Sequence, residues 1–136
     1  MNLKKYLVAS AGVFVIYSAL GLLIHEVILA PDYEPMVGVA LRSAEEFGAR
    51  VPLLYAGNLI FALAFCFIYA KGYEPGKSWL GQGARYGLIL GALLVPVALA
   101  EYVVFPVASS LAAKWIVLGY AQIVVAALVA AGLYRP

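Results

Sequence analysis

The sequence predicts an all-α integral membrane protein, a four-helix bundle that forms a single domain over residues 1–136. The composition is 65% hydrophobic and only 12% charged, which leaves too few polar side chains to cover a water-soluble domain. Polar or Pro- and Gly-containing connections separate four long apolar segments, at 6–30, 51–70, 83–105 and 111–134. Each approaches or exceeds the roughly 20 residues that a helix needs to cross a hydrocarbon core.

The first segment, 6–30, follows two lysines in the manner of a signal peptide. It is longer than the roughly 7–15 apolar residues of such a peptide. It also contains His25 and Glu26, and Pro31 would directly follow the cleavage site. We therefore expect it to be the first transmembrane helix.

The first connection, 31–50, is the longest and carries four acidic residues. Its apolar side chains recur at helical spacing, at Val37, Leu41, Ala44 and Phe47. This pattern predicts a short amphipathic helix on the outer membrane surface, and a solvated connector with no further role is the alternative.

The other connections predict where helices end. Gly72 directly after Lys71 is typical of a helix C-terminus, because glycine tolerates the left-handed conformation and lysine suits the helix dipole. Ser109 or Ser110 is the expected N-cap of the last helix. The short connection 106–110 makes the last two helices antiparallel neighbours.

Basic residues are unevenly divided between the two sides of the predicted bundle. With the N-terminus inside, the outer side holds only Arg42, Arg50 and Lys114. The cytoplasmic side holds Lys4, Lys5, Lys71, Lys77, Arg85 and Arg135. The positive-inside rule therefore favours cytoplasmic termini. Because these residues are scattered and form no stripe, nucleic acid is not an expected partner.

The third segment carries a glycine ridge, Gly83, Gly87 and Gly91, on one helix face. Such a face lets another backbone approach closely in lipid. The sequence leaves open whether the partner is a helix of the same chain or another subunit.

Three ionisable residues lie within the predicted spans, where they are costly and often functional: His25, Glu26 and Glu101. Counted back from Pro31 and Pro106, His25 and Glu101 lie at one depth, roughly 8–9 Å inside the outer helix ends. Pro96 is expected to kink the third helix and open a small hydrated pocket below Glu101. Other side chains that reach this outer half are Tyr55, Asn58, Lys114, Trp115 and Gln122.

Two interpretations of this cluster stay open. One is a polar cavity, open to the outside, that binds a small molecule, an ion or a proton. The other is a buried hydrogen bond between His25 and Glu101 that fixes helix register, with Glu26 and Lys114 reaching the interface.

No catalytic residue, metal site or cofactor is expected. The only cysteine, Cys66, excludes an intrachain disulfide, and a single histidine leaves a haem without paired ligands. Neither an HExxH pair nor a GxSxG motif occurs.

Four stretches together resemble a family of small, uncharacterised bacterial four-helix membrane proteins, a domain of unknown function. They are IHEVIL at 24–29, KGYEPGKSWLGQGARYGLILG at 71–91, VVFPVASSLAAKW at 103–115 and LYRP at the end. The resemblance covers nearly the whole chain. It implies the four-helix fold and the bacterial cytoplasmic (inner) membrane, and it supplies no catalytic residue.

The leading functional hypothesis is an interaction protein, either an accessory or scaffold subunit of a membrane complex or a homo-oligomer. Its partners would be the lipid bilayer and other membrane subunits or a second copy. The alternative is a transporter of a small solute, an ion or protons that uses the outer polar cluster. A membrane enzyme or a binder of a lipophilic cofactor is the third hypothesis.

Overall fold

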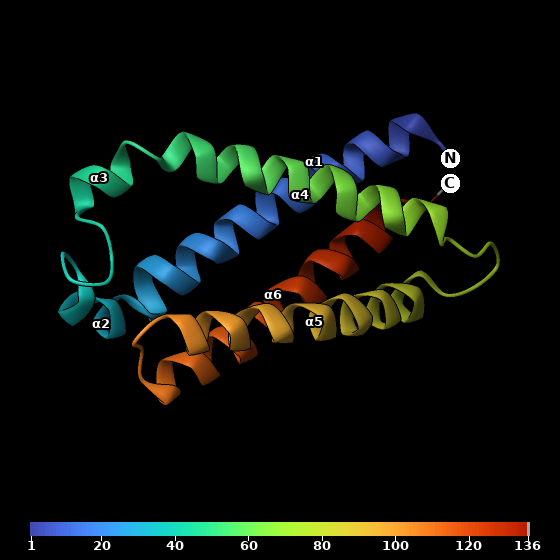
Figure 1. Cartoon of the computed structure of the whole chain (residues 1–136). Coiled ribbons are helices and arrows are strands. Elements are labelled where there is room, and N and C mark those ends of the chain that lie inside the picture. Colours follow the sequence, from blue (N-terminus) through green and yellow to red (C-terminus); the bar gives the residue numbers. More distant parts are fainter. Residues whose placement is uncertain (136) are drawn as a thin grey trace.

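A computed structural model describes residues 1–135 and shows an all-α fold (Figure 1). Four helices are long and apolar enough to cross a membrane. They are α1 (Leu3–Leu22) with its continuation η1 (Leu23–Ile28), α4 (Val51–Lys71), α5 (Trp79–Val104) and α6 (Ser109–Leu133). The predicted all-α fold with four membrane-length helices is therefore confirmed.

The ends of these helices differ from the predictions by a few residues. Helix α1 begins at Leu3, because the Asn2 side chain caps it and accepts a hydrogen bond from the Lys5 N–H at 3.1 Å. Helix α5 begins at Trp79, four residues before the predicted start at Gly83.

The prediction of a serine N-cap on α6 is wrong. Ala108 is the last extended residue and occupies the cap position, so Ser109 and Ser110 already lie in the first turn.

The first membrane helix does not continue as a regular α-helix to residue 30. Its last turns, η1, form a π-helix in which the Leu29 N–H donates to the Ile24 carbonyl at 2.8 Å, five residues back. Pi-helical turns of this kind insert one extra residue into the helical ladder and often occur at functional sites. His25 and Glu26 both lie in this turn.

The prediction of one amphipathic helix in the first connection is wrong. The segment instead forms α2 (Ala30–Tyr33), the 3-10 turn η2 (Glu34–Met36) and α3 (Ala44–Gly48). Pro35 lacks the backbone donor that a longer helix needs, and Gly38 has a φ of 77°, which reverses the chain. Ser43 then starts α3 with a capping box.

Helix α1 packs between α4 and α6, and α5 packs along α6. Figure 1 shows α4 and α5 on opposite sides of the α1–α6 pair. Both chain termini lie at one end, which we call the proximal end, together with the connection 72–78; the Asn2 N–H donates to Tyr134 Oη there at 3.2 Å. The opposite, distal end carries residues 29–50 and 105–108.

The glycine ridge of α5 faces α6 of the same chain. A Cβ atom at Gly83 would lie 2.8 Å from Ala131 Cβ, and one at Gly87 would lie 2.8 Å from Val124 Cα. Distances this short are clashes, so only glycine allows this approach of the two helices. The question that the sequence left open is answered: the ridge is an intrachain packing surface.

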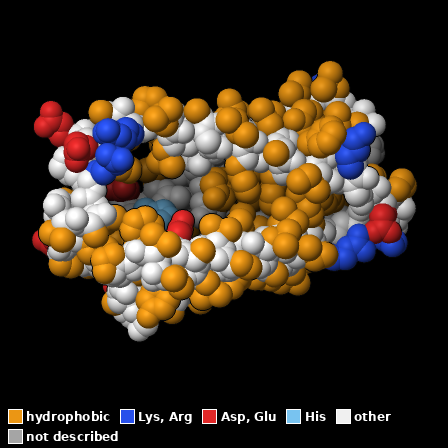
Figure 2. All heavy atoms as spheres, viewed as in Figure 1, with side chains coloured by type: hydrophobic (Ala, Val, Ile, Leu, Met, Phe, Trp, Pro, Cys, Tyr) orange, Lys and Arg blue, Asp and Glu red, His pale blue; other side chains and the backbone are white. Residues whose placement is uncertain are grey.

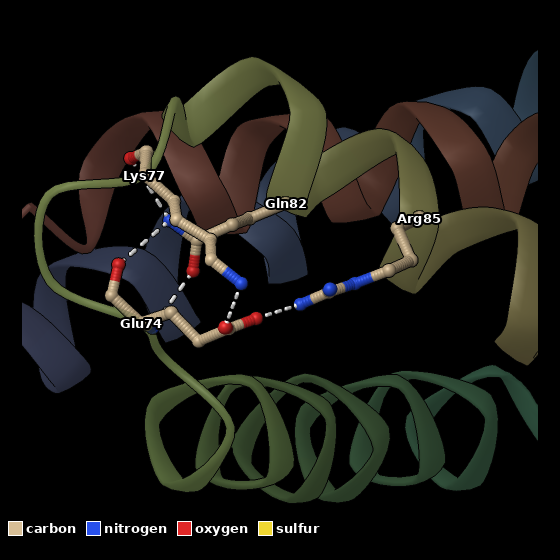
Figure 3. A network of polar contacts seen from close by, with 4 residues as sticks. All are labelled: Glu74, Lys77, Gln82 and Arg85. Atoms are coloured by element: carbon tan, nitrogen blue, oxygen red, sulfur yellow. Dashed lines mark hydrogen bonds and ion pairs between the residues drawn. The ribbon is translucent and has the colours of Figure 1, made fainter.

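The connection 72–78 is bound to α5 by the buried amide of Gln82 (Figure 3). Gln82 Oε1 accepts from the Glu74 N–H at 2.8 Å, and Gln82 Nε2 donates to the Glu74 and Lys77 carbonyls at 3.2 and 3.1 Å. The Glu74 carboxylate also forms ion pairs with Lys77 and Arg85. These contacts hold the α4–α5 connection in place at the proximal end.

Candidate functional site

A cavity of about 360 Å³ lies toward the distal end, between the first membrane helix, α5 and α6. Both His25 and Glu101 line it. Figure 2 shows the molecule hollowed between its upper and lower helices, with a histidine side chain in pale blue inside the hollow. The structure thus brings together the two residues that the sequence placed at one depth.

Tyr33 connects His25 to the far wall of the cavity. Its Oη lies 2.8 Å from His25 Nδ1 and accepts a hydrogen bond from Trp115 Nε1 at 2.7 Å. The indole N–H can only donate, so the Tyr33 hydroxyl proton is available for His25 Nδ1.

Burial raises the pKa of the Tyr33 phenol, although the Trp115 hydrogen bond acts in the opposite direction. Nearby carboxylates raise this pKa further, because they disfavour a second negative charge. The phenol therefore keeps its proton. The carboxylates are those of Asp32, Glu101 and Glu26.

Glu101 lies between two hollows. Besides the main cavity it lines a smaller one of about 200 Å³, and Trp115 lines both. Met36, Ala40 and Leu41 of the distal connection also line the smaller hollow. Glu101 is therefore adjacent to both the main cavity and the space under this connection.

The hydrogen bond between His25 and Glu101, which the second interpretation requires, is not formed in the described chain, so that interpretation is wrong. Tyr33 occupies His25 Nδ1 instead. Over residues 1–135, the three ion pairs are Lys77–Glu74, Arg85–Glu74 and Lys114–Asp32, and none involves His25, Glu26 or Glu101.

Three other candidates from the sequence, Glu26, Asn58 and Lys114, lie outside the cavity lining. Glu26 is exposed on η1. Asn58 donates to Ser18 Oγ at 3.1 Å and so joins α4 to α1. Lys114 binds both carboxylate oxygens of Asp32, at 2.7 and 2.8 Å, and so joins α6 to α2.

Pro96 lies within α5, which continues as a helix to Val104. Its neighbours Val95 and Val97 line the cavity. A proline at this position cannot donate the backbone hydrogen bond to the Ala92 carbonyl. Helix α5 is therefore weakened at the level of the cavity without being interrupted.

Sequence reasoning missed two residues of the site, Tyr33 and Tyr120. Tyr33 belongs to a connection, and nothing local indicates that this connection folds back over His25. Tyr120 lines the cavity while its Oη donates to the Leu88 carbonyl at 2.6 Å. It packs over Gly91, where a Cβ would lie 3.0 Å from the ring, and this pairing follows only from the tertiary structure.

Gln122 carries a polar group into the floor of the same cavity. It is buried, and its Nε2 donates to the Tyr17 carbonyl at 2.8 Å. Both residues line the cavity, so this bond joins α6 to α1 beneath the site.

In the part of the chain that the structure describes, no three His, Cys, Asp or Glu side chains form a group that could hold a metal ion. Comparison of the chain with protein-family models, curated proteins and solved structures finds no match. The resemblance to small bacterial four-helix proteins stays a prediction.

Proposed function

We propose that this membrane protein binds a small molecule in the cavity lined by His25 and Glu101, as the binding step of transport across the bilayer. The observation that carries the proposal is the convergence of these two side chains, from separate helices, on one cavity. Intramembrane ionisable residues that face a cavity are typical of substrate and ion pathways.

The dimensions and the rigidity of the cavity support ligand binding. A volume of about 360 Å³ is within the range of small-molecule sites, roughly 300–1,000 Å³. The Trp115–Tyr33–His25 chain of hydrogen bonds holds the imidazole in place before any ligand arrives. Neither His25 nor Glu101 is committed to an ion pair among the described residues.

The hypothesis of an accessory subunit or homo-oligomer loses its main motivation. Its main support was the glycine ridge as a possible interface with another subunit, and α6 of the same chain covers that ridge.

We also propose that the distal end faces the outside of a bacterial cytoplasmic membrane and that both termini are cytoplasmic. The excess of Lys and Arg at the proximal end supports this orientation. The resemblance to bacterial membrane proteins supports the compartment. In this orientation the cavity would receive its ligand from the outer side.

Filling the cavity tests the proposal. Gly119 lines it, and a Cβ there would meet no atom within 4 Å, so Gly119→Leu places a side chain in the cavity without a clash at its Cβ. Gly57 has equal space on α4 but does not line the cavity, which makes Gly57→Leu the matched control.

The assay uses Trp115 as an internal probe, because it lines the cavity and the only other tryptophan, Trp79, lies at the start of α5. In a Trp79→Phe background, benzyltrimethylammonium, neopentylbenzene and phenylmethanesulfonate serve as cationic, neutral and anionic probes of similar shape. At least one should change Trp115 fluorescence in nanodiscs and enter proteoliposomes. Gly119→Leu should abolish both signals, and Gly57→Leu should preserve them.

A response that survives Gly119→Leu would place binding elsewhere and contradict the proposal. Failure of all three probes to change the fluorescence would also contradict it. A probe that binds in the cavity but does not enter proteoliposomes would overturn the transport part alone.

A further inference from the structure

We infer that the ligand of this cavity is a small organic cation with an apolar body. The inference rests on the proposed function and adds the chemical class of the ligand. It follows from the charge of the lining, from the aromatic side chains around it and from its apolar wall.

The lining carries an uncompensated acidic group. Glu101 is its only acidic residue, and the lining contains no Lys or Arg. The nearest basic residue along α6, Lys114, is already bound to both oxygens of Asp32. A cationic ligand would give Glu101 the ion-pair partner that the described chain does not supply, whereas an anion would add like charge beside it.

A second carboxylate strengthens this electrostatic bias. Glu26 lies one residue after His25 on the π-helical turn and also has no ion-pair partner among residues 1–135. The carboxylates of Glu101 and Glu26 both raise the pKa of Tyr33, so their negative field reaches the wall of the cavity. A field of this sign concentrates cations.

Four aromatic residues also line the cavity: Tyr17, Tyr33, Trp115 and Tyr120. Three of them have their polar atoms in hydrogen bonds with other protein groups. Trp115 Nε1 donates to Tyr33 Oη, which also contacts His25 Nδ1, and Tyr120 Oη donates to the Leu88 carbonyl. What these rings can still offer a ligand is π-electron density, which attracts cations within about 6 Å of a ring centroid. Carboxylate and aromatic rings together are the chemistry that recognises alkylammonium groups.

Part of the lining is aliphatic. Leu94, Val95, Val97 and Ile116 offer no hydrogen-bonding side chain. A fully hydrated metal ion would lose water there without replacement, whereas the hydrocarbon part of an organic cation gains contact. This wall therefore selects an organic cation over an inorganic one.

The three-probe assay in nanodiscs tests the inference. Benzyltrimethylammonium should change Trp115 fluorescence at concentrations at least about tenfold lower than neopentylbenzene, its uncharged isostere. Phenylmethanesulfonate should give no response. Sodium ions alone should not compete.

Two substitutions locate the charge that is recognised. Glu101→Gln should weaken cation binding about tenfold or more and leave the response to neopentylbenzene unchanged, because only the charge is removed. Glu101→Asp retains the charge and should retain the preference for the cation. Glu45→Gln, on the exposed helix α3, is the control and should have no effect.

The outcomes separate this inference from the proposed function. If the neutral or the anionic probe binds in the cavity as tightly as the cation, the inference is wrong and the proposed function stands. If no probe binds, both are wrong. Should Glu101→Gln fail to fold, the preference of the wild-type protein among the three probes still decides the matter.

Discussion

Tyr33 Oη lies 2.8 Å from His25 Nδ1, which bonds the distal connection to the π-helical turn of the first membrane helix. The two rings are also stacked, with centroids 5.9 Å apart and an angle of 6° between their planes. This contact sets the orientation of the only histidine in the chain.

Replacing Tyr33 with Phe should destabilise the distal end. The change removes the shared partner of Trp115 Nε1 and His25 Nδ1, at a cost of about 0.5–1.5 kcal/mol for each lost hydrogen bond. Thermal unfolding in mild detergent measures the effect. Tyr102→Phe is the control, because Tyr102 is exposed at a similar depth and forms no hydrogen bond in the described chain. Equal melting temperatures for the two variants would contradict the role given to Tyr33.

Replacing Gly87 with Ala should separate α5 from α6. The new Cβ would lie 2.8 Å from Val124 Cα, a backbone atom that cannot move aside, and overpacking of this kind costs about 1–3 kcal/mol. Gly81→Ala is the matched control on the same helix, because its Cβ would find Ser78 Cβ at 4.0 Å. That variant should be neutral or more stable, since alanine favours a helix over glycine.

Unfolding measurements compare the stability of the Gly87→Ala and Gly81→Ala variants, and size-exclusion chromatography measures their oligomeric size. Because the ridge faces α6 of the same chain, the oligomeric size should not change in either variant. A Gly87→Ala protein of unchanged stability but smaller size would show that this face packs against another subunit.

The ion pairs of Glu74 predict how stability depends on pH. Hydrogen bonds from Arg85 and then Lys77 hold the pKa of this carboxyl at about 2, against an ordinary value of 4.5. A lowered native pKa stabilises the folded state fully above about pH 4.5, and this contribution is lost as the pH falls toward about 2.

Glu74→Gln should therefore lower the melting temperature at pH 7 and have progressively less effect below about pH 4.5. Arg85→Gln, which removes the cation with the largest effect, should reduce this pH dependence. A difference between wild type and Glu74→Gln that is the same at pH 7 and pH 3 would exclude this linkage.

Cysteine labelling tests the proposed orientation. In a Cys66→Ala background, a cysteine at Lys77 or after the C-terminus should be protected from an impermeant thiol reagent in intact cells. A cysteine at Glu45, on the exposed helix α3, should react. Lysed cells, where all three should react, provide the control. The opposite labelling would place the cavity on the cytoplasmic side.

The sequence by itself determined the class of the protein and the positions of its long helices. The predicted segment 51–70 and the observed helix Val51–Lys71 agree closely, because hydropathy and the Lys71–Gly72 ending are local properties. It also placed His25 and Glu101 at one depth, since the rise of a helix is fixed at about 1.5 Å per residue. Both residues do line one cavity.

Only the tertiary structure decided which groups meet across the chain. His25 bonds to Tyr33 and not to Glu101, Lys114 binds Asp32, and Asn58 turns to Ser18. These contacts depend on the rotation of each helix about its axis and on the path of the distal connection. Hydropathy constrains the rotation weakly, because lipid accepts apolar side chains on every outward face.

The glycine ridge shows the same division. Its spacing on α5 predicted close packing, and the packing is there. The partner, α6, was set by the short connection after Val104 and by small residues such as Ala127 and Ala131 that meet the ridge. A motif on one helix specifies the distance at which a neighbour can pack, whereas the identity of that neighbour depends on both surfaces and on the chain that joins them.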